Sequence, residues 1–222
     1  MLEWSNRHAW RACVAVQATV GSNPTLSAGR ERREIVTTSI RKVNLTDLSS
    51  TDPKIKYGCA RNLLAIARDN PAELYPNIDY FVKLLGSENN ILKWTAIDVI
   101  GFLSKADKES KVDKLMNKLF KLLDTGKLIT ANHAISALTN IALNKPEYQN
   151  KITGELLKVE HYNYDTDECR NIALGKVILA LSSYFNQLED RKDVIEFVRR
   201  QTKNTRNATK KKAEQFLKSL NK

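Results

Sequence analysis

Apolar residues recur at helical spacing from Asp52 almost to the C-terminus, and turn-forming residues interrupt them at regular intervals. The first stretch begins at Asp52-Pro53, an N-cap residue followed by a proline that fits the first helical turn. It ends at Asn70-Pro71, because proline does not continue a helix. A second helix is predicted from Pro76 to Leu85, just before Gly86. The pattern therefore predicts two helices joined by a short turn.

The same pairing of helices recurs along the rest of the chain. Apolar periodicity predicts helices at about 90–104 and 108–124, at about 127–144 and 147–159, and at about 166–186 and 190–202. A last helix is predicted over about 206–221. The pattern is helical throughout this region, so we expect an all-α fold.

One alanine aligns the first helices of all the pairs. The aligned residues are Ala60, Ala96, Ala134, Ala173 and Ala213, at spacings of 36, 38, 39 and 40 residues. A larger apolar residue follows each alanine at the fourth position, and the seventh position is also apolar, although it is alanine again in two of the five helices. A small side chain lets two helices approach closely where they cross, so we expect these alanines to lie in helix crossings. The pairs form an internal repeat.

With these alanines and a period near 40 residues, the chain resembles the HEAT and armadillo-like family of helical repeats from Asp52 to Leu220. The resemblance implies a right-handed α-solenoid of about four helical hairpins plus a terminal helix, and a protein-binding or scaffold role. An irregular helical bundle is the alternative. We expect a repeat domain over 52–204, a basic C-terminal helix over 205–222, and a polar linker over 29–51.

Residues 1–28 are expected to be a spurious or disordered extension. The segments RHAWRAC and GSNPTLSA can be coded by DNA that resembles the anticodon arm and the TΨC arm of a serine-tRNA gene, in the right order. An open reading frame through such a gene would place the true start between about Gly29 and Leu45. A signal peptide with Ala12–Val20 as its apolar region is the alternative, although Gln17 interrupts that region.

Composition narrows the class of protein. The chain has 222 residues, of which 42% are hydrophobic and 27% are charged, the balance of one soluble domain. No apolar run approaches the roughly 18 residues of a membrane span. Three cysteines do not build a disulfide framework, so a reducing compartment and a cytoplasmic location are expected.

The net charge of +11 comes from the two ends of the chain. Residues 43–189 contain 18 basic and 18 acidic residues, whereas residues 190–222 contain 11 basic and 4 acidic residues. Lys210, Lys211 and Lys212 are the densest basic run. The C-terminal charge either binds nucleic acid, an acidic partner or an anionic membrane surface, or forms the polar cap that an open repeat end needs.

A second set of lysines follows 3-4-3 spacing within the neutral region: Lys111, Lys114, Lys118 and Lys121. On one helix they would share an arc of roughly 80°. The family resemblance puts second helices on the concave surface, which would turn this stripe toward a ligand. A solvated helix face is the alternative.

Common catalytic and cofactor motifs are missing from the sequence. No phosphate-binding glycine loop, HExxH or CxxC occurs, so no cofactor and no metal is expected. Cys59 and Cys169 lie on apolar faces and are interpreted as core residues. His133 has no acidic partner nearby in sequence. A cluster with some likeness to a metal site is interpreted as a helix start capped by Thr166; it comprises His161, Asp165, Asp167 and Glu168.

Trp94 and Asp98 form a sharper candidate, because they lie one turn apart where the other repeats have mostly small or polar residues. Their spacing is similar to the Trp-x-x-x-Asp pair of DNA alkylation-repair glycosylases built on HEAT-like repeats. That resemblance implies a carboxylate that stabilises positive charge on the sugar and an aromatic ring that holds the nucleotide. The alternative is that Trp94 packs against the preceding segment. We therefore expect a non-enzymatic protein-binding module, with a nucleic-acid binder or glycosylase as the alternative function.

Overall fold

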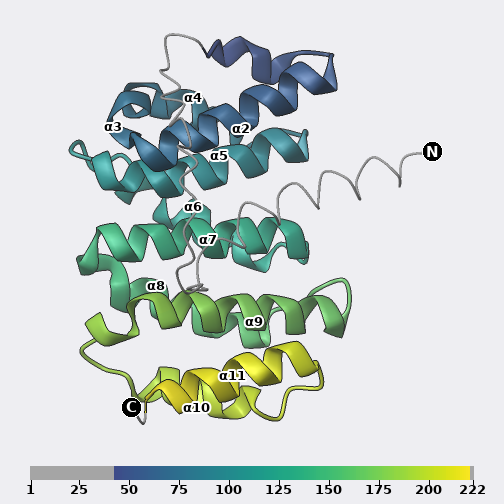
Figure 1. Ribbon diagram of the computed structural model, residues 1–222, viewed down its shortest axis with the longest axis vertical. Coiled ribbons are helices and arrows are strands. Elements are labelled where there is room, and N and C mark those ends of the chain that lie inside the picture. The colour runs from purple at the N-terminus through teal and green to yellow at the C-terminus, as the bar shows by residue number, and fades with distance from the viewer. Residues whose placement is uncertain (1–42, 221–222) are drawn as a thin grey trace, which may run out of the picture. The chain divides into compact units, whose positions relative to one another are not determined.

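The computed structural model describes residues 43–220, and all regular secondary structure in that range is helical (Figure 1). Five long helices start the successive hairpins or end the chain, and we call them the first helices. They are α2 (Pro53–Asp69), α5 (Asn90–Leu103), α7 (Leu128–Asn144), α9 (Asp167–Tyr184) and α11 (Asn207–Ser219). The all-α prediction is thereby confirmed.

The returning arms have shorter α-helices, and the first three contain 3-10 turns. The first consists of α3 (Pro71–Leu74), η3 (Tyr75–Asn77) and α4 (Ile78–Leu84). The second consists of η5 (Asp113–Leu115), α6 (Met116–Lys121) and η6 (Leu122–Asp124). The third consists of η7 (Pro146–Tyr148), α8 (Gln149–Leu157) and η8 (Lys158–His161), and the fourth is α10 (Lys192–Gln201). Two further 3-10 turns, η4 (Ser104–Ala106) and η9 (Phe185–Gln187), extend α5 and α9.

Side-chain caps fix the starts of three first helices. The Asp52 carboxylate accepts a hydrogen bond from the backbone N–H of Lys54 at 2.8 Å. Asn89 accepts from the N–H groups of the first turn of α5, and Thr166 accepts from the N–H of Cys169 at 3.1 Å. These caps satisfy amides that have no partner inside the helix. The predicted caps at Asp52 and Thr166 are confirmed.

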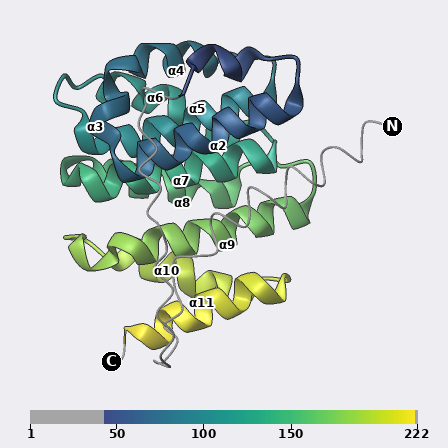
Figure 2. The same ribbon diagram turned by 45° about the horizontal axis from the view of Figure 1, so that its top comes forward.

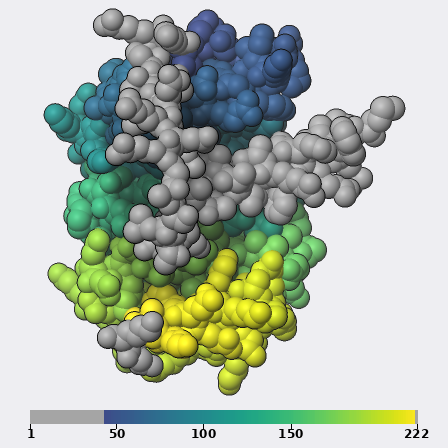
Figure 3. Space-filling view, viewed as in Figure 1, coloured from purple at the N-terminus to yellow at the C-terminus, as the bar shows by residue number. Residues whose placement is uncertain are grey.

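The first helices lie side by side in chain order, and the returning arms form a second layer behind them (Figures 1 and 2). α5 packs between α2 and α7, α7 between α5 and α9, and α9 between α7 and α11. The space-filling view shows the same order as successive bands of colour (Figure 3). Each hairpin therefore packs mainly on its neighbours in sequence.

The aligned alanines lie in this packed layer. Ala96, Ala134, Ala173 and Ala213 are fully buried, and Ala60 is 6% exposed. Gly101 shows how tight one crossing is, because a Cβ atom there would lie 2.6 Å from the Cα atom of Ala137. The expectation that small residues occupy the helix crossings therefore agrees with their burial.

The region expected to be a polar linker ends in packed structure. Residues Leu45–Ser49 form a 3-10 turn, η2, that packs on α2. Leu48 is fully buried, and the Cys59 thiol donates to the carbonyl oxygen of Asn44 at 3.5 Å. Residues 45–49 therefore do not belong to a linker, because the Leu48 side chain packs on α2 and is fully buried. The predictions for residues 1–28, and the part of the linker prediction that covers 29–42, lie outside the described residues.

The predicted helix over 108–124 begins late. Residues 107–112 form a turn in which Ser110 has a φ of 54°, a left-handed conformation. The Asp107 carboxylate stabilises this turn by accepting from the backbone N–H groups of Lys111 and Val112 at 2.9 and 3.0 Å. Helical structure therefore starts only at Asp113.

Candidate functional site

The Asp98 carboxylate lies in the crossing of α5 and α7, against His133. The Asp98 oxygen and His133 Nδ1 are 2.8 Å apart, and their side chains are only 13% and 5% exposed. Because a carboxylate can only accept, the imidazole donates its Nδ1 proton to Asp98. A partner for His133 therefore exists, although it lies 35 residues away in sequence.

Trp94 belongs to the same cluster. Its indole ring stacks on the His133 imidazole, with centroids 5.5 Å apart and planes inclined by 10°. Its Nε1 donates to the Thr130 hydroxyl at 3.1 Å. Trp94 thus packs on the following first helix, and the interpretation that it packs on the preceding segment is wrong. The cause is its position two residues before Ala96, which faces the next repeat.

Equivalent positions meet in the crossing of α9 and α11. The Thr209 hydroxyl donates to the carbonyl oxygen of Asn171 at 2.7 Å, in the register of Thr130 and Trp94. The Lys212 ammonium donates to the carbonyl oxygen of Gly175 at 3.3 Å, in the register of His133 and Asp98. The candidate catalytic positions are therefore positions at which neighbouring hairpins are joined.

The polar groups of Asp98 and Trp94 already have partners within the protein. The Asp98 carboxylate already accepts from a buried imidazole, and the Trp94 ring is stacked and hydrogen bonded. Both interactions hold α5 to α7. A signal in the sequence could have found them: Asp98 lies two residues after its aligned alanine, and His133 lies one residue before the next.

A buried ionic network at the hairpin turns is a feature that the sequence reasoning missed. The Asp107 side chain is fully buried and accepts from Lys145 Nζ at 2.8 Å and from the Tyr75 hydroxyl at 2.6 Å. Lys145 also pairs with Asp113. Burial and the hydrogen bond to Asp107 raise the pKa of Tyr75 to about 12. The network joins three successive turns, and its members are too far apart in sequence to form a motif.

Burial and the two carboxylates act in opposite directions on Lys145. Burial alone would lower the pKa of its ammonium, but the carboxylates of Asp107 and Asp113 outweigh that effect and raise it. Lys145 therefore stays charged at neutral pH, and it is a structural cation.

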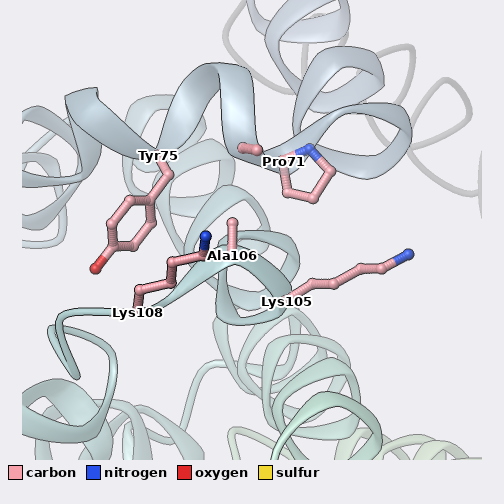
Figure 4. Close-up of a pocket in the computed structure, with 6 residues that line it drawn as sticks. Pro71, Tyr75, Lys105, Ala106 and Lys108 are labelled. Carbon is pink, nitrogen blue, oxygen red and sulfur yellow. The ribbon is translucent and has the colours of Figure 1, made fainter.

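A shallow hollow lies beside this network, between α3 and η4 (Figure 4). Its walls come from Pro71, Ala72 and Tyr75 on one side, and from Lys105, Ala106 and Lys108 on the other. In Figure 4 the Lys108 amine points into the hollow, whereas Lys105 extends away from it. The Tyr75 hydroxyl is held by Asp107, so the hollow presents mainly apolar atoms and one amine.

The lysine stripe of the second layer is not continuous. Lys111 lies in the turn before the helix and pairs with Asp79 at 3.0 Å and with Glu109 at 3.5 Å. Lys114, Lys118 and Lys121 are exposed on η5 and α6. The prediction that all four lysines share one helix face is therefore wrong, because Asp107 holds residue 111 in a turn.

The three consecutive lysines of α11 have different environments. Lys210 lies 3.9 Å from Glu214, and Lys211 is exposed. Lys212 is partly buried against α9, and this burial, followed by the charges of Arg206 and Lys176, lowers the pKa of its ammonium. The basic run is thus not one uniform surface.

The remaining candidates have ordinary structural partners. Cys59 is buried, which raises the pKa of its thiol, and Cys169 is half-buried. Asp165 pairs with Lys127, Asp167 with Arg170, and Glu168 with Arg206. Within residues 43–220, no group of histidine, cysteine and acidic side chains has an arrangement suited to a metal ion. In the same range, no helix is both long enough and apolar enough to cross a membrane.

Comparison with known proteins gives a structural likeness and no family. No protein-family model matches the chain, and no curated protein matches it. A solved structure described as "Crystal Structure of Engineered Protein. Northeast Structural Genomics Consortium Target OR329" is similar at 20% identity and a TM-score of 0.45. The match covers 78% of this chain and 76% of that one.

Proposed function

We propose that the chain is a non-enzymatic protein-binding or scaffold module of the HEAT or armadillo-like repeat type, with a right-handed α-solenoid of four hairpins and a terminal helix. One observation carries the proposal: the crossing of α5 with α7 and the crossing of α9 with α11 are joined at equivalent positions of their helices. Trp94 contacts Thr130 in the first crossing, as Asn171 contacts Thr209 in the second. About one turn further along, Asp98 contacts His133, as Gly175 contacts Lys212. Repeats stacked in this way present long continuous surfaces suited to a partner chain.

The candidate catalytic pair also supports a binding function. Asp98 and Trp94 make contacts within the crossing of α5 and α7, so both have a structural role that does not depend on a substrate. A glycosylase would use the same two residues on a flipped-out nucleotide. The alternative of a nucleic-acid binder depends on the basic C-terminal region.

DNA binding and base release separate these functions. For a protein-binding module we expect short duplex and single-stranded DNA to bind weakly and without length dependence, as measured by fluorescence anisotropy at 50 and 200 mM salt. A DNA-binding protein with six phosphate contacts would instead lose affinity by about 10³-fold between these concentrations. It would also lose affinity when Lys210, Lys211 and Lys212 are replaced together.

The matching positive test is capture of partners on the full chain from the native host, followed by mass spectrometry. We expect a protein partner that stays bound after nuclease treatment. Release of an alkylated base that Asp98→Asn abolishes would contradict the proposal and favour the glycosylase. Capture that nuclease treatment abolishes would favour the nucleic-acid binder.

A further inference from the structure

Charge divides unequally between the two layers of helices. The first helices contain eleven basic and five acidic residues, a net charge of +6. The second layer contains nine basic and nine acidic residues, counted over 71–84, 113–124, 146–161 and 192–201. The excess positive charge of the helices therefore belongs to the first layer.

Within the first layer, the positive charge lies on the two outermost helices. α2 and α11 each contain four basic residues and one acidic residue. α5 and α9 each have equal numbers of basic and acidic residues, and the 17 residues of α7 include no Asp, Glu, Lys or Arg. With 27% charged residues in the chain, a helix of that length would have about four or five. The middle of the layer is thus depleted of charge.

The same middle region exposes apolar side chains, although Ile55 and Tyr57 of α2 are exposed as well. α5, α7 and α9 have a neighbour on each side and returning arms behind, so their exposed side chains lie on the outer face of the layer. Leu143 is 40% exposed and Leu179 is 49% exposed. We call six of the exposed and partly exposed apolar residues of this face the apolar belt: Ile91, Trp94, Phe102, Ile129, Leu143 and Leu179.

Cations without a carboxylate partner flank the belt. Lys54 and Arg61 are exposed on α2, and Lys211 and Lys218 are exposed on α11. Among residues 43–220, none of these four side chains takes part in an ion pair. A centre with few charges and with aromatic side chains, bordered by polar residues, is typical of a protein interface.

We infer that the outer face of the first helices binds a segment of a partner protein that has an apolar middle and acidic residues at both ends. The inference rests on the proposed protein-binding function and names its surface. Apolar side chains of the segment pack on the belt, and its carboxylates pair with the cations of α2 and α11. Charge complementarity at both ends selects this occupant and fixes its position.

The spacing of the helices gives the length of the segment. Four spacings of about 8–10 Å separate α2 from α11, which gives about 32–40 Å. An extended segment covers that distance with about ten to twelve residues at roughly 3.3 Å each. A nucleic acid fits less well, because its phosphates are continuous, whereas α5, α7 and α9 together have no net charge.

Selection from a random library of twelve-residue peptides displayed on phage, with the full chain as target, tests the inference. We expect enriched peptides with apolar residues in the middle and Asp or Glu at both ends. Their affinities, measured by fluorescence anisotropy, should fall at least about tenfold for Leu143→Asp combined with Leu179→Asp. They should fall about fivefold or more for Lys211→Glu combined with Lys218→Glu, with a weaker salt dependence.

The matched control is Lys114→Glu combined with Lys118→Glu, which makes the same change of charge on the second layer. It should leave the affinity within about twofold of wild type. All substituted residues are exposed, so circular dichroism should show an unchanged helical fold. If peptides bind but lose affinity only with the control variant, the inferred binding surface is wrong. The proposed protein-binding function would then still hold. No enriched peptide at all would overturn both.

Discussion

The crossing of α5 with α7 and the crossing of α9 with α11 use equivalent positions for different chemistry. In the first, side chains of both helices meet, as in the 2.8 Å pair between Asp98 and His133. In the second, side chains of α11 reach backbone carbonyl oxygens of α9, as Lys212 does at Gly175. Packing of the helices therefore sets which positions meet, whereas the residue types at these positions differ between the two crossings.

This difference explains why residue type alone does not identify the structural role of these positions. A tryptophan and an aspartate one turn apart suggest a nucleotide site when only their own helix is considered. In the repeat alignment, Trp94 and Asp98 are equivalent to Asn171 and Gly175 of α9. Those two residues join hairpins through their backbone carbonyl oxygens, without any catalytic group. Variants at equivalent positions can therefore test the comparison directly.

The largest effect is expected at Gly101, where the first crossing is tightest. Gly101→Ala places a Cβ atom 2.6 Å from the Ala137 Cα atom, so we expect a loss of about 3 kcal/mol in the free energy of unfolding. Gly58→Ala is the matched control, because no atom beyond the local backbone of its own helix lies within 4 Å of the added Cβ. It should stabilise by about 0.5–1 kcal/mol. Urea unfolding measures both, and equal effects would contradict the tight crossing.

A smaller loss is expected when an aligned alanine is enlarged. Ala134→Leu should lower the free energy of unfolding by about 2 kcal/mol, because the fully buried site has no room for three more carbons. Ala96→Leu should act similarly. Ala208→Leu changes an exposed alanine of α11 and should stay within about 0.5 kcal/mol of wild type. Melting temperatures of Ala96→Leu and Ala134→Leu that match the control would contradict the repeat alignment.

Valine at the two equivalent threonines should separate the crossings. Thr130→Val removes the acceptor of the Trp94 indole N–H and should cost about 1–2 kcal/mol. Thr209→Val removes a donor to the Asn171 carbonyl, which keeps its helical hydrogen bond, so the loss should stay below about 1 kcal/mol. Chemical denaturation should rank them in this order, and the reverse order would mean that Trp94 gains little from Thr130.

The smallest effect concerns the charge in the second crossing. Burial in the folded state lowers the pKa of the Lys212 ammonium below its value in the unfolded chain. A charged Lys212 is therefore less favourable in the folded chain than in the unfolded chain. Lys212→Met should therefore stabilise slightly at pH 7, by less than about 1 kcal/mol after allowance for solvent screening. The gain should shrink as the pH rises through the folded-state pKa, because wild-type Lys212 is then neutral. A gain that is constant with pH would contradict this cause.

Local signals predicted the helices well. Proline, asparagine and aspartate mark helix ends through their own backbone preferences, which is why α2 and α9 begin where the sequence indicated. The aligned alanines are buried as expected, because small side chains suit helices that pack closely. The late start of η5 was not predictable from periodicity, since the carboxylate of Asp107 outside the helix causes it.

The candidate site was less predictable because its contacts join distant residues. Asp98 and His133 are 35 residues apart, and Lys145 meets Asp113 from 32 residues away. The first pair follows from the aligned alanines once both helices are placed side by side. The second pair does not, because its members lie near hairpin turns, where the repeat alignment gives no register.

A double-mutant cycle on Asp98 and His133 tests the central claim most directly, namely that the polar positions of the first helices join neighbouring hairpins. The free energies of unfolding of Asp98→Ala, His133→Ala and the double variant give their coupling. We predict a coupling of about 1–3 kcal/mol, because the two side chains share one largely buried hydrogen bond. Additivity within about 0.5 kcal/mol would contradict the claim and leave Asp98 available for another role.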